Sequence, residues 1–420
     1  MLHYLLFAVY LVLLSWLLLR VPFIRDSGIN RQVILGLFFI KVAAGIAIGW
    51  ISLHWYGSGN DYWDLNRESW NEYQLMIHHP GEYFSNLFSS GYEGGYDGIF
   101  SSYDSYWNDL RGNVVIKLLS VFNIFSRGDY YVNSLFFNFL VFFAHVTLYR
   151  LFIQLYPGKN TLVILGSFVL PSALYFSSGI HKDGLMFLLL SVVIYTIFQG
   201  LRKNAFTAKR LSLILAGMFA LFIVRNYTCL VLVPAALAWI IAVRTKKNTL
   251  LIFGVVYLSA GLLLSGLSVV TGGRMNPLKV IVQKQSDYLN LGSSETSIPL
   301  QKLQPNLASF TLNAPQAIDH SLLRPYIWEL PTKSILPFNL ELLLYEILFL
   351  VFIFFRSQAA PGLKHPYILF TIFFCLGGFL LIGYIVPALG AIIRYRGIYF
   401  PFLITPLLCS IDWQILKVKK

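Results

Sequence analysis

The residues best suited to chemistry form an acidic run that begins at Asp61, directly after an apolar segment. Asp64 and Glu68 follow at spacings of three and four residues, which would place the three carboxylates on one face of a helix. A carboxylate in this position can act as the general base that deprotonates an acceptor hydroxyl. Asp61 could do so alone, or it could share a divalent cation, Mg²⁺ or Mn²⁺, with Asp64. The alternative is a surface helix whose acids are solvated.

The same part of the chain is rich in aromatic side chains. Nine of the 19 acidic residues lie between residues 57 and 110, where they alternate with many Tyr and Trp residues. Carboxylates accept hydrogen bonds from hydroxyl groups, and aromatic rings stack on the C–H faces of sugars. The pattern is therefore typical of a carbohydrate site, in which Trp63 and Glu68 would contact the sugar. The alternative is an aromatic belt at a membrane surface.

Basic residues occur in three further short segments. His181 and Lys182 join two apolar runs, Arg225 lies in a very short turn, and Arg394 and Arg396 stand at the start of the last run. Charges this close to lipid are costly unless they have partners. If the three segments converge, they can bind a phosphate or pyrophosphate. The alternative is contact with lipid headgroups or with the acidic residues.

Several other kinds of chemistry are disfavoured by the sequence. It contains no Walker-type glycine loop, GxSxG, HExxH or GxGxxG motif, so ATP hydrolysis by this chain alone is not expected. Cys229, Cys375 and Cys409 all fall in apolar runs without CxxC spacing, which predicts small buried side chains. His181 lacks the second histidine and the carboxylate spacing of a zinc site.

Membrane-spanning helices must position these residues. Of the 420 residues, 57% are hydrophobic and 12% are charged, whereas about a quarter of the residues in a soluble domain are charged. The net charge of +13 is scattered in short clusters, which is not the pattern of a nucleic-acid-binding face. The apolar runs are 2–19, 33–56, 131–149, 160–178, 184–200, 211–224, 227–243, 249–271, 338–355, 366–386 and 398–411. We therefore expect an all-α fold, a polytopic bundle of about eleven transmembrane helices forming one membrane domain over residues 1–420.

The lysines and arginines between the runs predict the orientation. Alternate connections are short and basic, and the positive-inside rule places them in the cytoplasm. These basic segments are 20–31, 150–159, 202–210, 244–247, 356–364 and 417–420. The N-terminus is then outside, the C-terminus is cytoplasmic, and two long loops, about 57–130 and 272–337, are external. Loops of this length are usually functional.

Three charged residues fall inside the apolar runs themselves. Lys41 lies in the second run, and Glu341 and Glu346 lie in the ninth. Such residues are functional candidates by default. Lys41 could equally form an ion pair with either glutamate, and the sequence does not decide between these possibilities.

The pattern resembles the GT-C superfamily of membrane glycosyltransferases. The resemblance rests on Asp61 with Asp64 in the first large external loop, on about eleven helices, and on a basic outer face. The segment Gly59-Asn60-Asp61-Tyr62, together with Arg394 and Arg396, is also similar to bacterial O-antigen and exopolysaccharide polymerases. Segments 178–184, 324–329 and 390–396 resemble envelope proteins of Bacteroidetes-type bacteria.

The resemblance implies a glycosyltransferase at the periplasmic face of the bacterial inner membrane, acting in envelope polysaccharide or glycoconjugate assembly. Its partners would be a polyprenyl phosphate- or pyrophosphate-linked sugar donor, a glycan or lipid-linked acceptor, and membrane lipids. Asp61 would deprotonate the acceptor. Lys182, Arg225 and either Arg394 or Arg396 would hold the leaving phosphate.

Two other classes of protein stay open. A transporter or flippase for lipid-linked glycans would need polar residues along a path through the membrane, and often repeated halves. A non-catalytic subunit of an envelope machine is the third possibility. The polar residues of this chain are concentrated on one face, and this favours the enzyme.

Overall fold

The secondary structure is helical. The computed structural model describes residues 2–57, 59–89, 92, 105–270, 276–290, 295–329 and 332–418. Apart from two isolated β-bridges, all regular structure in these ranges consists of helices, which confirms the predicted all-α class.

Seven helices in the described ranges are long and apolar enough to cross a membrane. They are α1 (Leu2–Arg20), α3 (Arg31–Tyr56), α7 (Tyr130–Leu155), α10 (Lys182–Arg202), α11 (Ala208–Thr245), α15 (Leu336–Phe354) and α16 (Pro366–Ile385). Two bent pairs raise the number to nine if each forms one span. The pairs are α8 (Asn160–Phe168) with α9 (Pro171–Ser178), bent by 48°, and α17 (Leu389–Gly397) with α18 (Phe400–Ser410), bent by 63°. The helices indicate a multi-pass membrane protein.

The predicted number of eleven spans is not confirmed, although the runs are helical. The runs 211–224 and 227–243 both belong to α11, which is interrupted at Arg225, where φ is −154° and ψ is 83°. The run 249–271 corresponds to α12 (Thr249–Val270). Its apolar part, Thr249–Leu263, is shorter than the helices that are long enough to cross a membrane. Hydropathy therefore located the helices, but it could not show how they bend and join.

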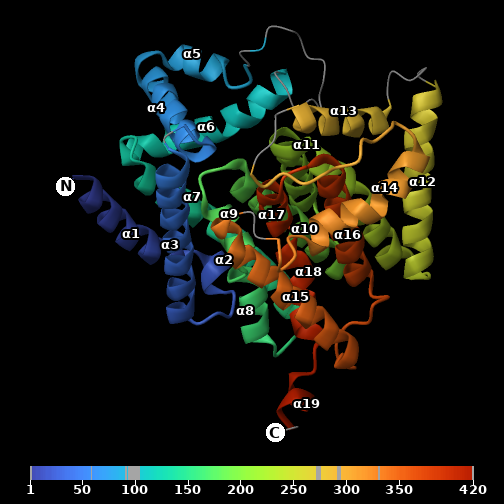
Figure 1. The fold of residues 1–420 in the computed structure, drawn as a ribbon. Helices are drawn as coiled ribbons and strands as arrows, with labels where there is room; N and C mark the ends of the chain where they lie inside the picture. Colours follow the sequence, from blue (N-terminus) through green and yellow to red (C-terminus); the bar gives the residue numbers. More distant parts are fainter. Residues whose placement is uncertain are drawn as a thin grey trace.

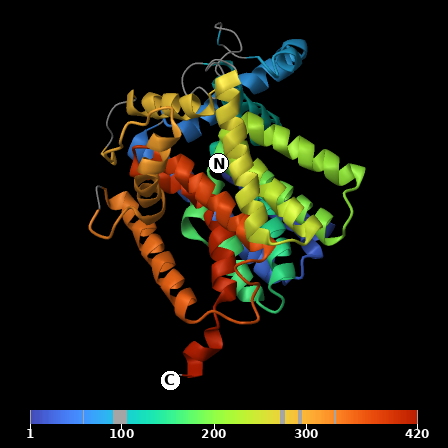
Figure 2. The same cartoon turned by 90° about the vertical axis from the view of Figure 1, so that its right-hand side faces the viewer.

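Helices from both long loops lie at the same end of the bundle (Figure 1). The first loop supplies α4 (Asp61–His78), α5 (Pro80–Ser85) and α6 (Tyr106–Ser126), and the second supplies α13 (Pro277–Asn290). The C-terminal helix α19 (Trp413–Val418) lies at the opposite end, and Figure 2 shows the same separation. The remaining elements are short: α2 (Pro22–Arg25), α14 (Leu307–Ile318), η1 (Asp319–Leu323) and η2 (Lys333–Ile335).

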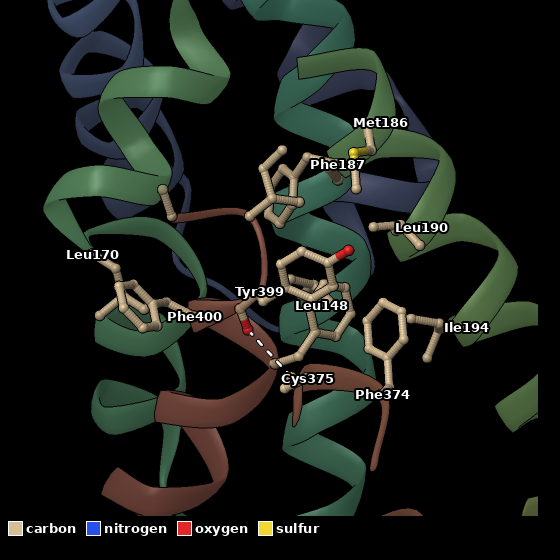
Figure 3. Packing of buried hydrophobic residues seen from close by; sticks show 14 of the residues in the cluster. Leu148, Leu170, Met186, Phe187, Leu190, Ile194, Phe374, Cys375, Tyr399 and Phe400 are labelled. Atoms are coloured by element: carbon tan, nitrogen blue, oxygen red, sulfur yellow. Dashed lines mark hydrogen bonds between the residues drawn. The ribbon is translucent and has the colours of Figure 1, made fainter. Parts of the chain in front are cut away.

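Large apolar side chains fill the centre of the bundle (Figure 3). Phe374 of α16 lies between its neighbours, with ring centroids 5.8 Å from Phe402 and 5.2 Å from Tyr399. Cys375 and Cys409 are buried and Cys229 is partly buried; all three are free thiols, which agrees with the sequence analysis. This packing fixes the helices that carry the polar groups described below.

Cysteine labelling tests the predicted orientation. In a variant without the native cysteines, we expect His79→Cys, between α4 and α5, to react with a membrane-impermeant maleimide in intact spheroplasts. Lys203→Cys, in the turn after α10, should react only after permeabilisation, because basic segments remain cytoplasmic. Both positions are exposed, so accessibility within the protein does not limit the reaction. Labelling of Lys203→Cys alone in intact spheroplasts would reverse the orientation.

Candidate anion-binding site

Three basic segments meet around Asp183, a fully buried carboxylate in the first turn of α10. Its Oδ2 accepts a hydrogen bond from Arg394 Nε at 2.5 Å, and its Oδ1 accepts one from an Arg225 amino group. His181 Nδ1 lies 3.0 Å from Oδ2. The segments around residues 181, 225 and 394 therefore converge in space, and both arginines pair with a carboxylate there. Asp183, which holds them together, was not singled out from the sequence.

Arg225 reaches the cluster because α11 breaks at this residue. Its NH1 donates to the Tyr227 hydroxyl at 2.5 Å, and its guanidinium lies 4.3 Å from the centre of the Tyr395 ring. Rings on two sides and a carboxylate on the third fix the guanidinium, whose planar fork suits such stacking.

Charged side chains hold both ends of the short helix α9. Glu341 of α15 accepts hydrogen bonds from the Ser172 backbone N–H through both carboxylate oxygens, each at 3.1 Å. Lys41 of α3 donates to Ser177 Oγ at 3.0 Å and to Ser178 Oγ at 3.2 Å. Each charge complements the partial charge of the helix end that it contacts. Within the described residues, the two charges thus bind opposite ends of α9 rather than each other, and α9 leads directly into the site.

His181 acts in this cluster as a neutral ring. Burial, followed by the charge of Arg394, lowers the pKa of His181 to about 3. A neutral imidazole has one donor and one acceptor nitrogen. Arg394 NH2 lies 2.6 Å from both ring nitrogens, and Nδ1 also lies 3.0 Å from Asp183 Oδ2. A neutral ring that donates from Nδ1 to Asp183 can accept from Arg394 only at Nε2. His181 therefore orients Arg394 and adds no charge.

Asp61 lies at the exposed edge of the cluster. It is the first residue of α4, and its Oδ2 is 3.6 Å from Arg394 NH1 and 3.8 Å from His181 Nε2. Its side chain is 68% exposed, whereas that of Asp183 is fully buried. Asp61 thus combines contact with a partly buried cation and access to solvent.

The other acidic residues of α4 lie apart from this cluster. Asp64 Oδ1 accepts from Arg67 NH2 at 2.6 Å, and Glu68 Oε1 is 3.9 Å from Arg67 Nε. The ranges that the structure describes contain no group of three or more His, Cys, Asp and Glu side chains suited to a metal ion. A cation shared by Asp61 and Asp64 thus finds no third carboxylate, cysteine or histidine ligand there. Asp97 and Asp104, of the same predicted loop, lie outside the described residues.

Trp63 has a different place from the one expected for a sugar-binding ring. It stacks on Tyr130 with ring centroids 4.3 Å apart, and its Nε1 donates to the Gly49 carbonyl at 3.0 Å. These contacts fasten α4 to α3 and α7. Trp63 therefore positions Asp61.

Arg396 is also directed away from Asp183, although it is two residues from Arg394. It is fully buried, and its NH1 donates to the carbonyl oxygens of Ser321, at 3.2 Å, and of Arg324. Arg396 secures η1 against α17. Of the two arginines between which the sequence could not choose, only Arg394 joins the cluster.

Further cations lie beside the cluster. Lys182 is the first residue of α10 and is within electrostatic range of Arg225 and Arg394. Lys284 of α13 and Arg111 of α6 are buried nearby. Neither residue could be singled out from the sequence, because each is a single cation in an amphipathic stretch of a long loop. Only the packing of α6 and α13 over the bundle end brings them to Arg225.

Comparisons with known proteins do not identify the chain. No protein-family model, curated protein or solved structure matches it. Function must therefore be argued from the geometry and chemistry of the site.

The variant Asp183→Asn tests the central role of this carboxylate. It keeps the side-chain shape but leaves Arg225 and Arg394 without a buried counter-charge. We expect the free energy of unfolding to fall by about 3–5 kcal/mol, as for other broken buried ion pairs. Denaturant unfolding of the detergent-purified protein measures this. Asp26→Asn, which removes an exposed pair with Arg25, is the matched control and should change little. Equal stability of the parent and Asp183→Asn would contradict the assignment.

Proposed function

We propose that this protein is a membrane glycosyltransferase that takes a sugar from a polyprenyl phosphate or pyrophosphate. The observation that carries the proposal is the position of the exposed Asp61 carboxylate, 3.6 Å from Arg394 in a partly buried group of cations. General base and anion-binding groups are adjacent, as glycosyl transfer from a phosphate ester requires. A lipid anchor would hold such a donor at the membrane surface, beside the end of the bundle where α4 begins.

The reaction can be written with named groups. Asp61 takes the proton of the acceptor hydroxyl while the acceptor oxygen forms a bond to the anomeric carbon. The bond from that carbon to the phosphate oxygen breaks, and its electron pair stays on the phosphate. Lys182 and Arg394 stabilise the negative charge that develops there. Arg225 contributes to the same positive field, held by Asp183.

The polar residues of the membrane interior support this reading over a transporter or flippase. A transport path requires polar groups that line a route through the bilayer. Lys41 and Glu341 instead hold the ends of α9. Glu346 lies in the wall of an apolar cavity of about 600 Å³ between α15, α16 and α18. The enzyme would act in envelope polysaccharide or glycoconjugate assembly, at the periplasmic face of a bacterial inner membrane.

Replacement of Asp61 tests the enzyme. Asp61→Asn removes the base without changing the shape, and loss of a general base typically lowers turnover on the order of a hundredfold or more. The measurement is transfer of sugar from lipid-linked saccharides, extracted from the source membranes, to product by the purified protein. Glu82→Gln, an exposed carboxylate variant on α5, is the control and should keep parental turnover. Turnover of Asp61→Asn within a few-fold of the parent would remove Asp61 from the mechanism.

A further inference from the structure

Lys284 carries a buried amino group that no part of the function above uses. The residue is 6% exposed, and its Nζ has no hydrogen-bond partner in the described part of the chain. Its ammonium nitrogen lies over the face of the Tyr227 ring, 4.6 Å from the ring centre. Burying an ammonium group without hydrogen bonds is costly. A buried amino group without a protein partner therefore indicates that a ligand accepts its hydrogen bonds.

The position of Lys284 is set by the next residue of α13. Gln285 is buried; its Nε2 donates to the Tyr384 carbonyl at 2.8 Å, and its Oε1 accepts from the Leu303 backbone N–H at 2.8 Å. These bonds tie α13 to the end of α16. The hydrogen bonds of Gln285 therefore fix the position of the helix that carries Lys284, so the location of the amino group does not depend on its flexible side chain alone.

Contacts connect Lys284 to Asp61 in a row. From Asp61, the row continues through Arg394 and Asp183 to Arg225, whose NH1 donates to the Tyr227 hydroxyl. The Tyr227 ring then contacts Lys284. A second buried donor without a partner in the described chain, Nε of Arg225, lies within this row. The part of the row away from Asp61 therefore carries two donors without a partner in the described chain, Arg225 Nε and Lys284 Nζ.

We infer that Lys284 is a second oxyanion-binding residue of this site, so that the ligand is a diphosphate ester. One phosphoryl group would lie by Lys182 and Arg394, next to the sugar and Asp61. The other would lie by Lys284 and the free Nε of Arg225. The inference rests on the proposed function for the identity of the ester as a lipid-linked sugar, but the second subsite itself rests on the contacts alone.

Binding measurements test the second subsite. Isothermal titration calorimetry of the detergent-purified chain would compare farnesyl diphosphate with farnesyl phosphate, and inorganic pyrophosphate with phosphate. We expect the parent to prefer each diphosphate. Lys284→Gln should weaken diphosphate binding about tenfold or more, the usual effect of losing a charged hydrogen bond, and should change monophosphate binding less than about twofold. Tighter binding of farnesyl diphosphate than of pyrophosphate supports a lipid headgroup as ligand, and equal binding supports a free anion.

Two further variants keep the test independent of folding. Lys279→Gln, on the exposed face of the same helix, should bind like the parent, and Lys284→Arg should retain the preference for diphosphates. Equal affinity of the parent for mono- and diphosphates, or an unchanged preference in Lys284→Gln, would overturn the inference. Sugar transfer in the same preparations separates the two proposals. Diphosphate binding that depends on Lys284, without any transfer, would keep the subsite and remove the glycosyltransferase.

Proton uptake provides a second measurement. Burial, followed by the charges of Arg111, Arg225 and Lys182, lowers the pKa of Lys284 to about 7, against a smaller opposing effect of Asp287. At pH 8 the free site therefore holds a mostly neutral Lys284, and a bound diphosphate should raise its pKa so that it gains a proton.

Titrations at pH 8 in buffers of different ionisation enthalpy measure the protons taken up. We expect the parent and Lys279→Gln to take up nearly one proton more per diphosphate than Lys284→Arg, which is always charged. Protons taken up by Lys182 or exchanged by the ligand are common to all three proteins and cancel in this difference. Equal proton uptake by the parent and Lys284→Arg would contradict a role of Lys284 in binding the anion.

Discussion

The shared contact of Asp183 with two arginines is the interaction on which the rest of the site depends. Arg225 comes from the break in α11 and Arg394 from α17, so one carboxylate joins segments that are far apart in the chain. Buried cations that face one another repel strongly when water is excluded. Asp183 offsets part of this repulsion and fixes both guanidinium groups, and neutral His181 completes the arrangement without adding charge. Because its oxygens are occupied, Asp183 is unsuited to proton transfer, and in the proposed reaction Asp61 has that role.

Charged side chains also stabilise the two ends of the short helix α9. A span that breaks in the membrane exposes backbone groups that lipid cannot satisfy. Glu341 supplies acceptors at one end of α9, and Lys41 supplies a donor at the other. These charges let the chain enter the site as an irregular segment between α9 and α10 while its helices remain in the bundle. Two of the three charged residues inside the apolar runs, Lys41 and Glu341, thus support the segment that leads into the site.

Much of the architecture could be predicted from the sequence, because apolar runs and basic turns act locally. The runs are helical, Asp61 begins a helix, and the segments with Arg225 and Arg394 converge. The number of spans was not predictable, since hydropathy does not register the bend at Arg225 that joins two runs in α11. The roles of Asp183 and Lys284 could not be predicted, because each role depends on contacts with residues far away in the chain. For the same reason the sequence could not distinguish Arg394 from Arg396, whose side chains point to different partners.

Exposure divides the site into two parts that suit different reactants. The cations Arg225 and Lys284 are buried, so their interactions with an anion are little weakened by solvent. Asp61 is open to water, so an acceptor hydroxyl can reach it without passing the cations. For the proposed reaction, a lipid-linked diphosphate would bind the buried row first and present its sugar toward Asp61. The acceptor would then approach from the side of α4, and the two substrates would meet where Arg394 contacts both the anion site and the base.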